Sequence, residues 1–422
     1  MKSKKIIAVI LIICICIGLY SCSTNKKTPS ESQTKIDVEK IAYDYKEDEK
    51  FDDMLKTFSL NSASTIFADG LNQNKNLCYS PVSLYIAFAL AASGAENQTQ
   101  SEMFAVLGLN GKDKQYISQQ INVLFGNLYF ENKYGALKIA NSIWLKENAD
   151  IKKEFNDNAE NHFYSQVFNA DFSDMPKTPD MMKKWVEDNT NKLISPSFDY
   201  DPDLIFMYII NTLYFKDSWK EPFDERSTKT DLFYVPNDEN IECEFMNKGI
   251  LSHPYFKGDG FTAASLDLYN GGKMTFVLPD ENTDIYDLLS SPGKLDYIFN
   301  DENSKIGDVT FKVPKFKTEA SFDLINALKN LGVQKAFSTK EADFSGITDE
   351  PIYISKITQD TYIKIDEKGV EAAAMTQIMM YAGGIPEPNE KIDMFLDRPF
   401  VYFITDKNGV VLFEGVIFNP NA

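Results

Sequence analysis

The sequence predicts an α+β fold, with helices concentrated in the first third of the chain and strands in the remainder. Apolar residues recur at spacings of three and four in several early segments, which is the period of a helix with one buried face. Later segments are mostly rich in Ile, Val, Phe and Tyr, which suit a pleated, half-buried surface. Helices first and strands later, without regular alternation, are typical of an α+β fold.

Five early segments have the helical spacing. Ser80 stands directly before Pro81, in the position of an N-cap, and a first-turn proline is tolerated because its missing N–H would have no helical partner there. The expected helices are residues 51–71, 81–93, 98–107, 114–128 and 151–162.

The strand-like segments follow, and no internal repeat separates them. Asn408-Gly409, between Phe403 and Val411, predicts a hairpin turn. No second break in composition appears after residue 50, so we expect one large domain. The expected strands are residues 136–145, 204–215, 261–266, 273–278, 309–313 and 399–404.

One segment, residues 366–376 (DEKGVEAAAMT), has an unusual run of small residues between strand-like residues 362–365 and a Gly/Pro-rich loop at 382–388. Consecutive alanines are poor strand formers. However, one alternating set from residue 370 onward is small or apolar and uncharged, which is a strand's pattern. The segment is therefore predicted to be a loop that is able to become a strand. This set is Val370, Ala372, Ala374, Thr376, Ile378 and Met380.

This segment resembles the proximal hinge of the serpins, inhibitors whose reactive-centre loop inserts into their main sheet. Further blocks resemble the same family in the same order, from about residue 51 to the end. They are residues 76–103, 211–223 (Asn-x-x-x-Phe-Lys-x-x-Trp-x-x-Pro-Phe), 313–316, 342–346, 397–400 and 413–416.

The resemblance implies a serpin fold, with helices packed around three β-sheets and an exposed reactive-centre loop. It also implies a protease inhibitor that acts as a suicide substrate. A target serine or cysteine endopeptidase would be acylated by the loop and trapped when the loop inserts, a mode of strand addition and strain release that serpins exemplify. A non-inhibitory serpin, acting as a binding or surface protein, is the alternative.

The resemblance also implies roles for single residues, which are carried over one by one. The shutter under the opening sheet would be Ser80, Ser83 and Asn211, with Gln359 in place of the usual histidine and still offering a donor and an acceptor. The breach, where the loop enters the sheet, would include Trp219, Lys315 and Glu367. The hinge would be Glu367, Gly369, Val370, Glu371, Ala372, Ala373, Ala374, Met375 and Thr376.

The family's spacing from Glu367 places the reactive bond at Gly383-Gly384, with Tyr381 and Ala382 as alternates. A glycine does not fill a specificity pocket, which favours an elastase-like or subtilisin-like target, or a papain-like one reading Ala382. Tyr381 would favour a chymotrypsin-like or subtilisin-like one. A trypsin-like target is not expected, because no Lys or Arg lies between Lys368 and Lys391.

The N-terminus is predicted to be a lipoprotein signal peptide, residues 1–21. Three lysines precede an uncharged, mostly apolar run over residues 6–19, shorter than the roughly 20 residues that span a bilayer. Leu-Tyr-Ser-Cys ending at Cys22 is similar to the bacterial lipobox, although Tyr20 is larger than usual. We expect lipidation at Cys22, anchoring at the bacterial cell membrane or surface, a flexible polar tether over residues 22–50, and a serpin domain over residues 51–422. An uncleaved anchor or an ordinary secretory peptide is the alternative.

The charge disfavours several classes of partner. The chain carries 43 Lys and Arg against 62 Asp and Glu, a net charge of −19. Such a surface repels nucleic acid and argues against a heparin-type cofactor. We expect a monomer whose Cys78 and Cys243 are buried thiols.

An enzyme with its own active site is the main alternative class. The only histidines are His162 and His253, and no Gly-x-Ser-x-Gly elbow, His-Glu-x-x-His or paired Cys-x-x-Cys occurs. Ser291 and Lys294 fit Ser-x-x-Lys, but the Pro-Gly between them indicates a turn instead of the helix start that this motif needs. We therefore expect no catalytic residues, metal or cofactor.

Overall fold

The structure, a computed structural model, describes residues 48–71, 74–147, 149–236, 239–289, 292–299, 301–371 and 389–422. Within these residues the α-helices are α1 Glu49–Leu71, α2 Pro81–Ser93, α3 Asn97–Val106, α4 Lys114–Leu128, α5 Lys153–Asn161, α6 Lys177–Asn189, α7 Ile285–Leu289, α8 Pro292–Leu295 and α9 Ile325–Asn330. No helix of this described part has the length and hydropathy needed to cross a membrane.

The strands are β1 Leu77–Tyr79, β2 Phe130–Glu131, β3 Gly135–Lys146, β4 Gln166–Ala170, β5 Met207–Ser218, β6 Lys229–Phe233, β7 Ile241–Gly258, β8 Phe261–Asp267, β9 Lys273–Pro279, β10 Lys305–Pro314, β11 Phe316–Asp323, β12 Lys356–Asp366, β13 Gly369–Val370, β14 Glu390–Phe395, β15 Phe400–Thr405 and β16 Val411–Ile417. The predicted α+β class is confirmed, as is the turn at Asn408-Gly409, which joins the antiparallel strands β15 and β16.

Two hydrogen-bonded sheets organise the molecule. The seven-stranded main sheet has the order β11-β12-β13-β5-β3-β2, with β4 paired to β3. The nine-stranded sheet includes β1, β16, β15, β9, β8, β7, β10 and β14. The family resemblance implies two further sheets beside the main one. Here they are continuous, because the 18-residue β7 pairs in turn with β6, β10 and β8.

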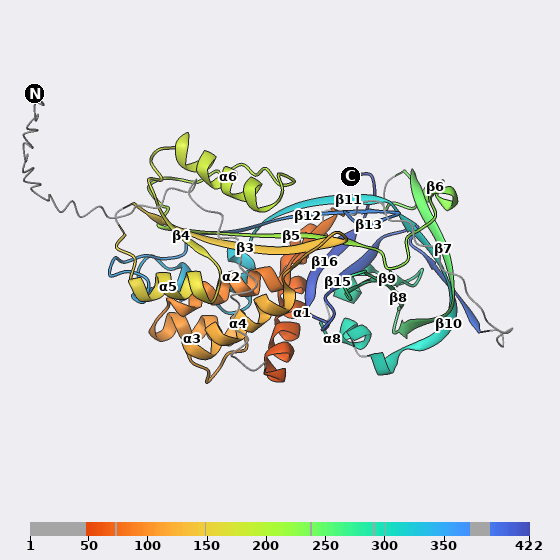
Figure 1. Cartoon of the computed structure of the whole chain (residues 1–422), viewed down its shortest axis with the longest axis horizontal. Coiled ribbons are helices and arrows are strands. Elements are labelled where there is room, and N and C mark those ends of the chain that lie inside the picture. Colours follow the sequence, from red (N-terminus) through yellow and green to blue (C-terminus); the bar gives the residue numbers. More distant parts are fainter. Residues whose placement is uncertain are drawn as a thin grey trace, which may run out of the picture.

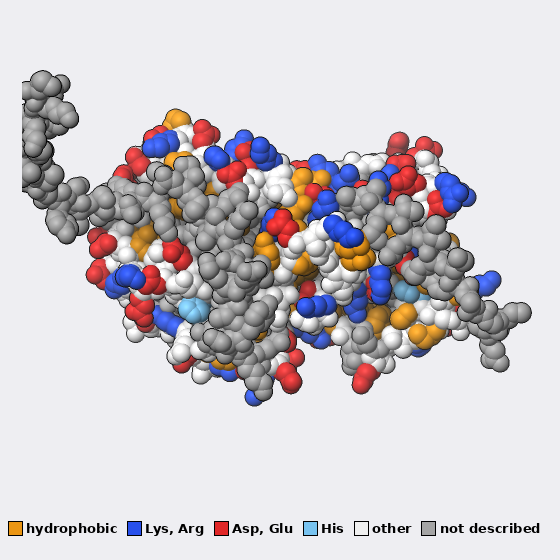
Figure 2. All heavy atoms as spheres, viewed as in Figure 1, with side chains coloured by type: hydrophobic (Ala, Val, Ile, Leu, Met, Phe, Trp, Pro, Cys, Tyr) orange, Lys and Arg blue, Asp and Glu red, His pale blue; other side chains and the backbone are white. Residues whose placement is uncertain are grey.

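The main sheet is covered on both faces. Figure 1 shows α6 on one face, while α2 packs against β3 and β5 on the other. Every residue of α2 is buried, and its sequence is accordingly apolar apart from Ser83 and Ser93 and the hydroxyl of Tyr85. A separate small core, including Trp144, Trp185 and Tyr208, lies between α6 and the sheet. The space-filling view in Figure 2 shows acidic and basic side chains interspersed over the visible described surface.

Two local expectations were wrong. Ser80 occupies the N-cap position of α2 but makes no side-chain capping bond, and Gln359 bonds its backbone N–H and carbonyl. Residues 292–295 are one helical turn, α8, and not the expected irregular turn, since a proline at the first helical position is compatible with a helix.

Candidate functional site

The central feature of the main sheet is the seam between β5 and β12. These strands are parallel neighbours over a short stretch, from Lys356 opposite Tyr208 to Asp360 opposite Thr212. Farther along, the two-residue strand β13 lies between them and is antiparallel to both. The seam is therefore closed at one end and already holds the start of a third strand at the other.

The residues of β13 begin the alternation of sides that a strand requires. Val370 pairs with Ile365 on β12 and Asp217 on β5, and its side chain is completely buried. The next residue, Glu371, is half-buried, and its N–H donates to the Lys364 carbonyl at 2.9 Å. Burial raises the pKa of the Glu371 carboxyl, although Lys216 and Lys364 lower it. Val370 thus points inward.

The turn before β13 is held by its backbone. Trp219 is 1% exposed, and its indole N–H donates to the Asp366 carbonyl at 2.9 Å. The Trp219 and Phe223 N–H groups donate to the carbonyls of Lys368 and Glu367, both at 2.9 Å. Gly369 has a φ of +148°, a conformation that favours glycine. Three consecutive carbonyls are thereby fixed by the segment that follows β5.

A charged cluster lies beside this turn. The Thr228 hydroxyl donates to Glu367 Oε1 at 2.7 Å, and the Lys315 ammonium lies 3.5 Å from the same oxygen. Lys315 also pairs with Glu244 at 3.1 Å. Burial works against ionisation of Glu367, but these partners outweigh it and lower the pKa of its carboxyl. The structure therefore brings together Trp219, Lys315 and Glu367, the three residues expected at the breach.

The expected shutter residues meet at the closed end of the seam. Gln359 Oε1 accepts from the Ser80 N–H at 2.8 Å, while its Nε2 donates to the Ser80 carbonyl at 2.9 Å and to Asn211 Oδ1 at 3.0 Å. Asn211 Nδ2 donates to the Ser83 carbonyl at 2.9 Å. This network ties both seam strands to α2 without any charge.

Sequence reasoning missed one member of this network and one of the breach. Asn141 on β3 accepts from Asn211 Nδ2 at 2.6 Å and is buried, and Thr228 binds Glu367 as described. Asn141 could have been found from the sequence, because it is a polar residue within an expected strand and a buried amide needs a hydrogen-bond partner. No comparable sequence signal marked Thr228.

Several expected site residues lie outside the described residues. These are the hinge positions Ala372, Ala373, Ala374, Met375 and Thr376, the reactive-bond candidates Tyr381, Ala382, Gly383 and Gly384, and the lipidation site Cys22.

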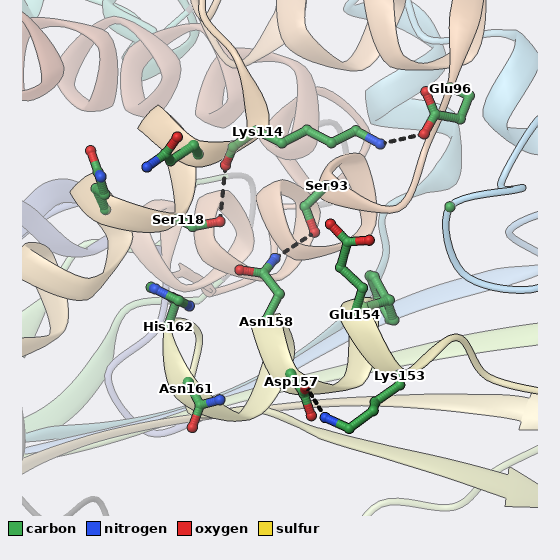
Figure 3. A pocket seen from close by; sticks show the side chains of 14 residues that line it. Ser93, Glu96, Lys114, Ser118, Lys153, Glu154, Asp157, Asn158, Asn161 and His162 are labelled. Atoms are coloured by element: carbon green, nitrogen blue, oxygen red, sulfur yellow. Dashed lines mark hydrogen bonds and ion pairs between the residues drawn. The ribbon is translucent and has the colours of Figure 1, made fainter.

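A polar cavity of about 920 Å³ lies between α4, α5 and the end of α2 (Figure 3). His162 lines it together with Ser93 and Ser118. The two serine hydroxyls donate to carbonyls of their own helices, at 2.7 Å to Leu90 and 2.9 Å to Lys114. This is how structural serines in a helix are satisfied, and neither donates to a base as an activated nucleophile does.

The second histidine and the cysteines lie elsewhere. His253 Nε2 is 2.7 Å from the Ser265 carbonyl, and burial lowers the pKa of its imidazole. Cys78 and Cys243 are buried and unpaired, as predicted, and burial raises the pKa of each thiol to about 11. No group of three or more metal-ligating side chains is found in the part of the chain that the structure describes.

Taken together, the seam has an uncharged network at one end and, at the other, a charged cluster beside the two-residue strand β13 that lies between β5 and β12. Comparison with known proteins gives the family: residues 53–420 match the family Serpin (serine protease inhibitor), and the chain belongs to it. The family supports protease inhibition in general as the function.

Three relatives illustrate its range. Serpin B6 of Pongo abelii is 30% identical over 381 residues, covering 86% of this chain and 98% of that protein. The native state of the thermophilic serpin tengpin superposes with a TM-score of 0.79 at 29% identity, covering 89% of this chain and 95% of tengpin. Thyroxine-binding globulin in complex with thyroxine has a TM-score of 0.76 at 26% identity, covering 88% of this chain and all of the other.

Proposed function

We propose that this chain inhibits an endopeptidase of the serine class, or a cysteine protease of papain type, by trapping it covalently. The observation that carries the proposal is β13, because Val370 already occupies a buried place between β5 and β12. Residues that continue this strand would enter the seam in the same register. Each added ladder hydrogen bond contributes roughly 0.5 to 1.5 kcal/mol.

The chemistry belongs to the target enzyme. Its nucleophile attacks the carbonyl carbon of the residue before the reactive bond, the new amine leaves, and an ester or thioester joins the enzyme to the loop. Water would normally hydrolyse this bond. Insertion of the loop carries the enzyme away before that happens, and the uncharged inward positions through Met380 present no buried charge that would oppose it.

The reactive bond is proposed at Gly383-Gly384, or shifted to Tyr381 or Ala382. The corresponding targets are elastase-, subtilisin-, chymotrypsin- or papain-like, and not trypsin-like. Incubation with such a panel, followed by a denaturing gel and intact mass, tests both points. The expected product is a boiling-resistant adduct of enzyme and chain, with release of the peptide after the cut bond.

The second candidate is a non-inhibitory ligand carrier. The similarity to thyroxine-binding globulin, observed in complex with thyroxine, supports this alternative. It predicts that every protease of the panel cleaves the loop, or ignores it, without forming an adduct.

We also propose that residues 1–21 are removed and that Cys22 carries a lipid which holds the serpin domain at a bacterial membrane surface. The lysine-rich start, the apolar run and the residues before Cys22 support this. Metabolic labelling with a fatty-acid analogue in a bacterial host should label the wild type, and Cys22→Ala should remove the label. Equal labelling of the two would contradict lipidation at Cys22.

A further inference from the structure

A second cavity, of about 330 Å³, lies where the segment after α6 crosses the main sheet. Residues 194–197 of that segment form one wall, and Glu319 to Ser321 of β11 with Asp360 of β12 form the other. Its volume is at the lower end of the roughly 300 to 1,000 Å³ typical of small-molecule sites.

The floor of this cavity contains a carboxyl group without a counter-ion. Gln359 and Thr361 both point toward the α2 side, where they bond Ser80 and the Cys78 carbonyl, so Asp360 between them points to the opposite face. Asp360 is 5% exposed, and the Ser321 hydroxyl is its hydrogen-bond partner. No Lys, Arg or His of the described residues forms an ion pair with it.

The other groups near Asp360 do not supply a positive charge. Glu319, the second acid of the cavity, is already paired with Lys317. Thr212, the neighbour of Asp360 across the seam, is fully buried, and its hydroxyl has no partner in the described part of the chain. Burial raises the pKa of Asp360, as expected for a carboxyl that lacks a cation. The facing wall offers hydroxyls and apolar groups, including Ser195, Ile194 and Pro196.

The two walls of the cavity belong to opposite sides of the seam. Ser195 donates to Glu187 of α6 at 2.7 Å, and α6 packs against β3, β4 and β5 through the small core that contains Trp185 and Tyr208. The other wall is β11 and β12. Since β13 can lengthen only if β12 and β5 separate, residues 194–197 must slide over Asp360 when it does. A molecule in the cavity would bridge the two sides.

We propose that this cavity binds a small aliphatic primary amine in its ammonium form, and that binding holds the seam closed. The ammonium would donate to the Asp360 carboxylate and to the Ser321 and Ser195 hydroxyl oxygens, while a short alkyl stem contacts Ile194 and Pro196. The effect on the seam rests on the proposed inhibitory function; the binding itself does not.

Butylammonium is a suitable probe, with butanol and butyrate as matched neutral and anionic controls, in ligand-observed NMR titrations of the full chain. Wild type should bind butylammonium at least tenfold more tightly than either control. Asp360→Asn, which keeps the shape of the side chain and removes its charge, should weaken butylammonium binding at least tenfold. Asp323→Asn, on β11 but outside the cavity, should leave the affinity for butylammonium unchanged. Equal affinity of wild type and Asp360→Asn, or equal binding of butanol, would overturn the site.

The bridging role has its own readout. Saturating butylammonium should increase the number of wild-type molecules cleaved per protease trapped, because insertion slows while hydrolysis does not. The ratio for Asp360→Asn should not change. An unchanged wild-type ratio would overturn the bridging role. If no protease is trapped at all but Asp360-dependent binding persists, the proposed inhibition fails and the binding site stands.

Discussion

At its breach end the seam is held by a partly hydrated charged cluster, whereas at its shutter end it is held by uncharged groups without access to water. Lys315 and Glu244 at the breach have side chains 31% and 59% exposed. Gln359 and Asn211 at the shutter are fully buried. Water can replace a lost partner at the breach but not at the shutter, where an unpaired group costs its full desolvation. We infer that the breach guides the loop and that the shutter sets the resistance to opening.

The largest effect on protease trapping is expected from a charge placed in the residues that follow β13. Val370 points inward, so the period of two places Ala374 inward and Ala373 outward. Ala374→Arg would force an always-charged group into the packed sheet at a cost of several kcal/mol. A barrier raised by about 3 kcal/mol slows insertion roughly a hundredfold.

Ala374→Arg should therefore be cleaved as an ordinary substrate, while its matched control Ala373→Arg still traps protease. Gel quantification of adduct against cleaved chain measures the difference. Equal trapping by the two variants would mean that the loop does not enter the seam in the register that β13 begins.

The shutter should show the next largest effect. Gln359→Leu removes three buried hydrogen bonds and leaves the Ser80 N–H, the Ser80 carbonyl and Asn211 Oδ1 without that partner. Each such loss costs about 1 to 3 kcal/mol, so native stability should fall by about 3 kcal/mol. Denaturant unfolding measures it, with Gln115→Leu on the exposed side of α4 as a neutral control. A loss below about 1 kcal/mol would place the resistance to opening elsewhere.

The same buried polar groups explain what the sequence did not reveal about the fold. Helix α2 was predicted with the observed bounds because its apolar residues have helical spacing and Pro81 marks its first turn. Only the end of β12 was predicted, since Gln359 and Thr361 point inward and Asp360 outward, leaving no alternation of polar and apolar residues there. The full length of strand β7 was also not predicted. Its partner strand changes from β6 to β10 to β8, so no single face stays buried along it.

The site was predicted only as far as family motifs reached. Asn211, Trp219 and Lys315 were located by their places in matching blocks, and Gln359 was located by its place where the family usually has the shutter histidine. Asn141 and Thr228 lie outside those blocks, and their contacts depend on strand register and loop path. The pairing of Val370 with Asp217 is likewise a tertiary fact that no local pattern encodes.

A smaller, pH-dependent effect is expected at Asp217, on β5 opposite Val370. Burial raises the pKa of its carboxyl to about 6, although bonds from Asn270 at 3.2 and 2.8 Å lower it. Because the folded pKa exceeds the ordinary 3.8, protonation of Asp217 favours the folded state. This contribution to the free energy of unfolding is full below about pH 4 and is lost as pH rises through about 6. A shift of about two pKa units changes the free energy of unfolding by about 3 kcal/mol at most.

Asp217→Asn should remove this pH dependence, so its stability relative to wild type should increase between pH 4 and pH 7. Urea unfolding at both values measures the change, with the exposed Asp393→Asn as control. A wild type whose stability shows no Asp217-dependent change over that range would contradict the raised pKa.

The smallest effect is expected at the breach itself. The pKa of Glu367 is lowered, since Thr228 and Lys315 outweigh burial, so its stabilising contribution exists above about pH 4.5 and is lost as pH falls through the folded value. Glu367→Gln should cost about 1 kcal/mol at pH 7, because the pair with Lys315 is partly hydrated, and this cost should shrink as the pH falls below 4.5. Glu244→Gln, which removes the more exposed partner of Lys315, should change stability less. Urea unfolding of both variants beside Gln359→Leu tests the comparison directly. If Glu367→Gln cost as much at pH 7 as Gln359→Leu, the breach would resist opening as strongly as the shutter, and the division of roles between the two ends of the seam would be wrong.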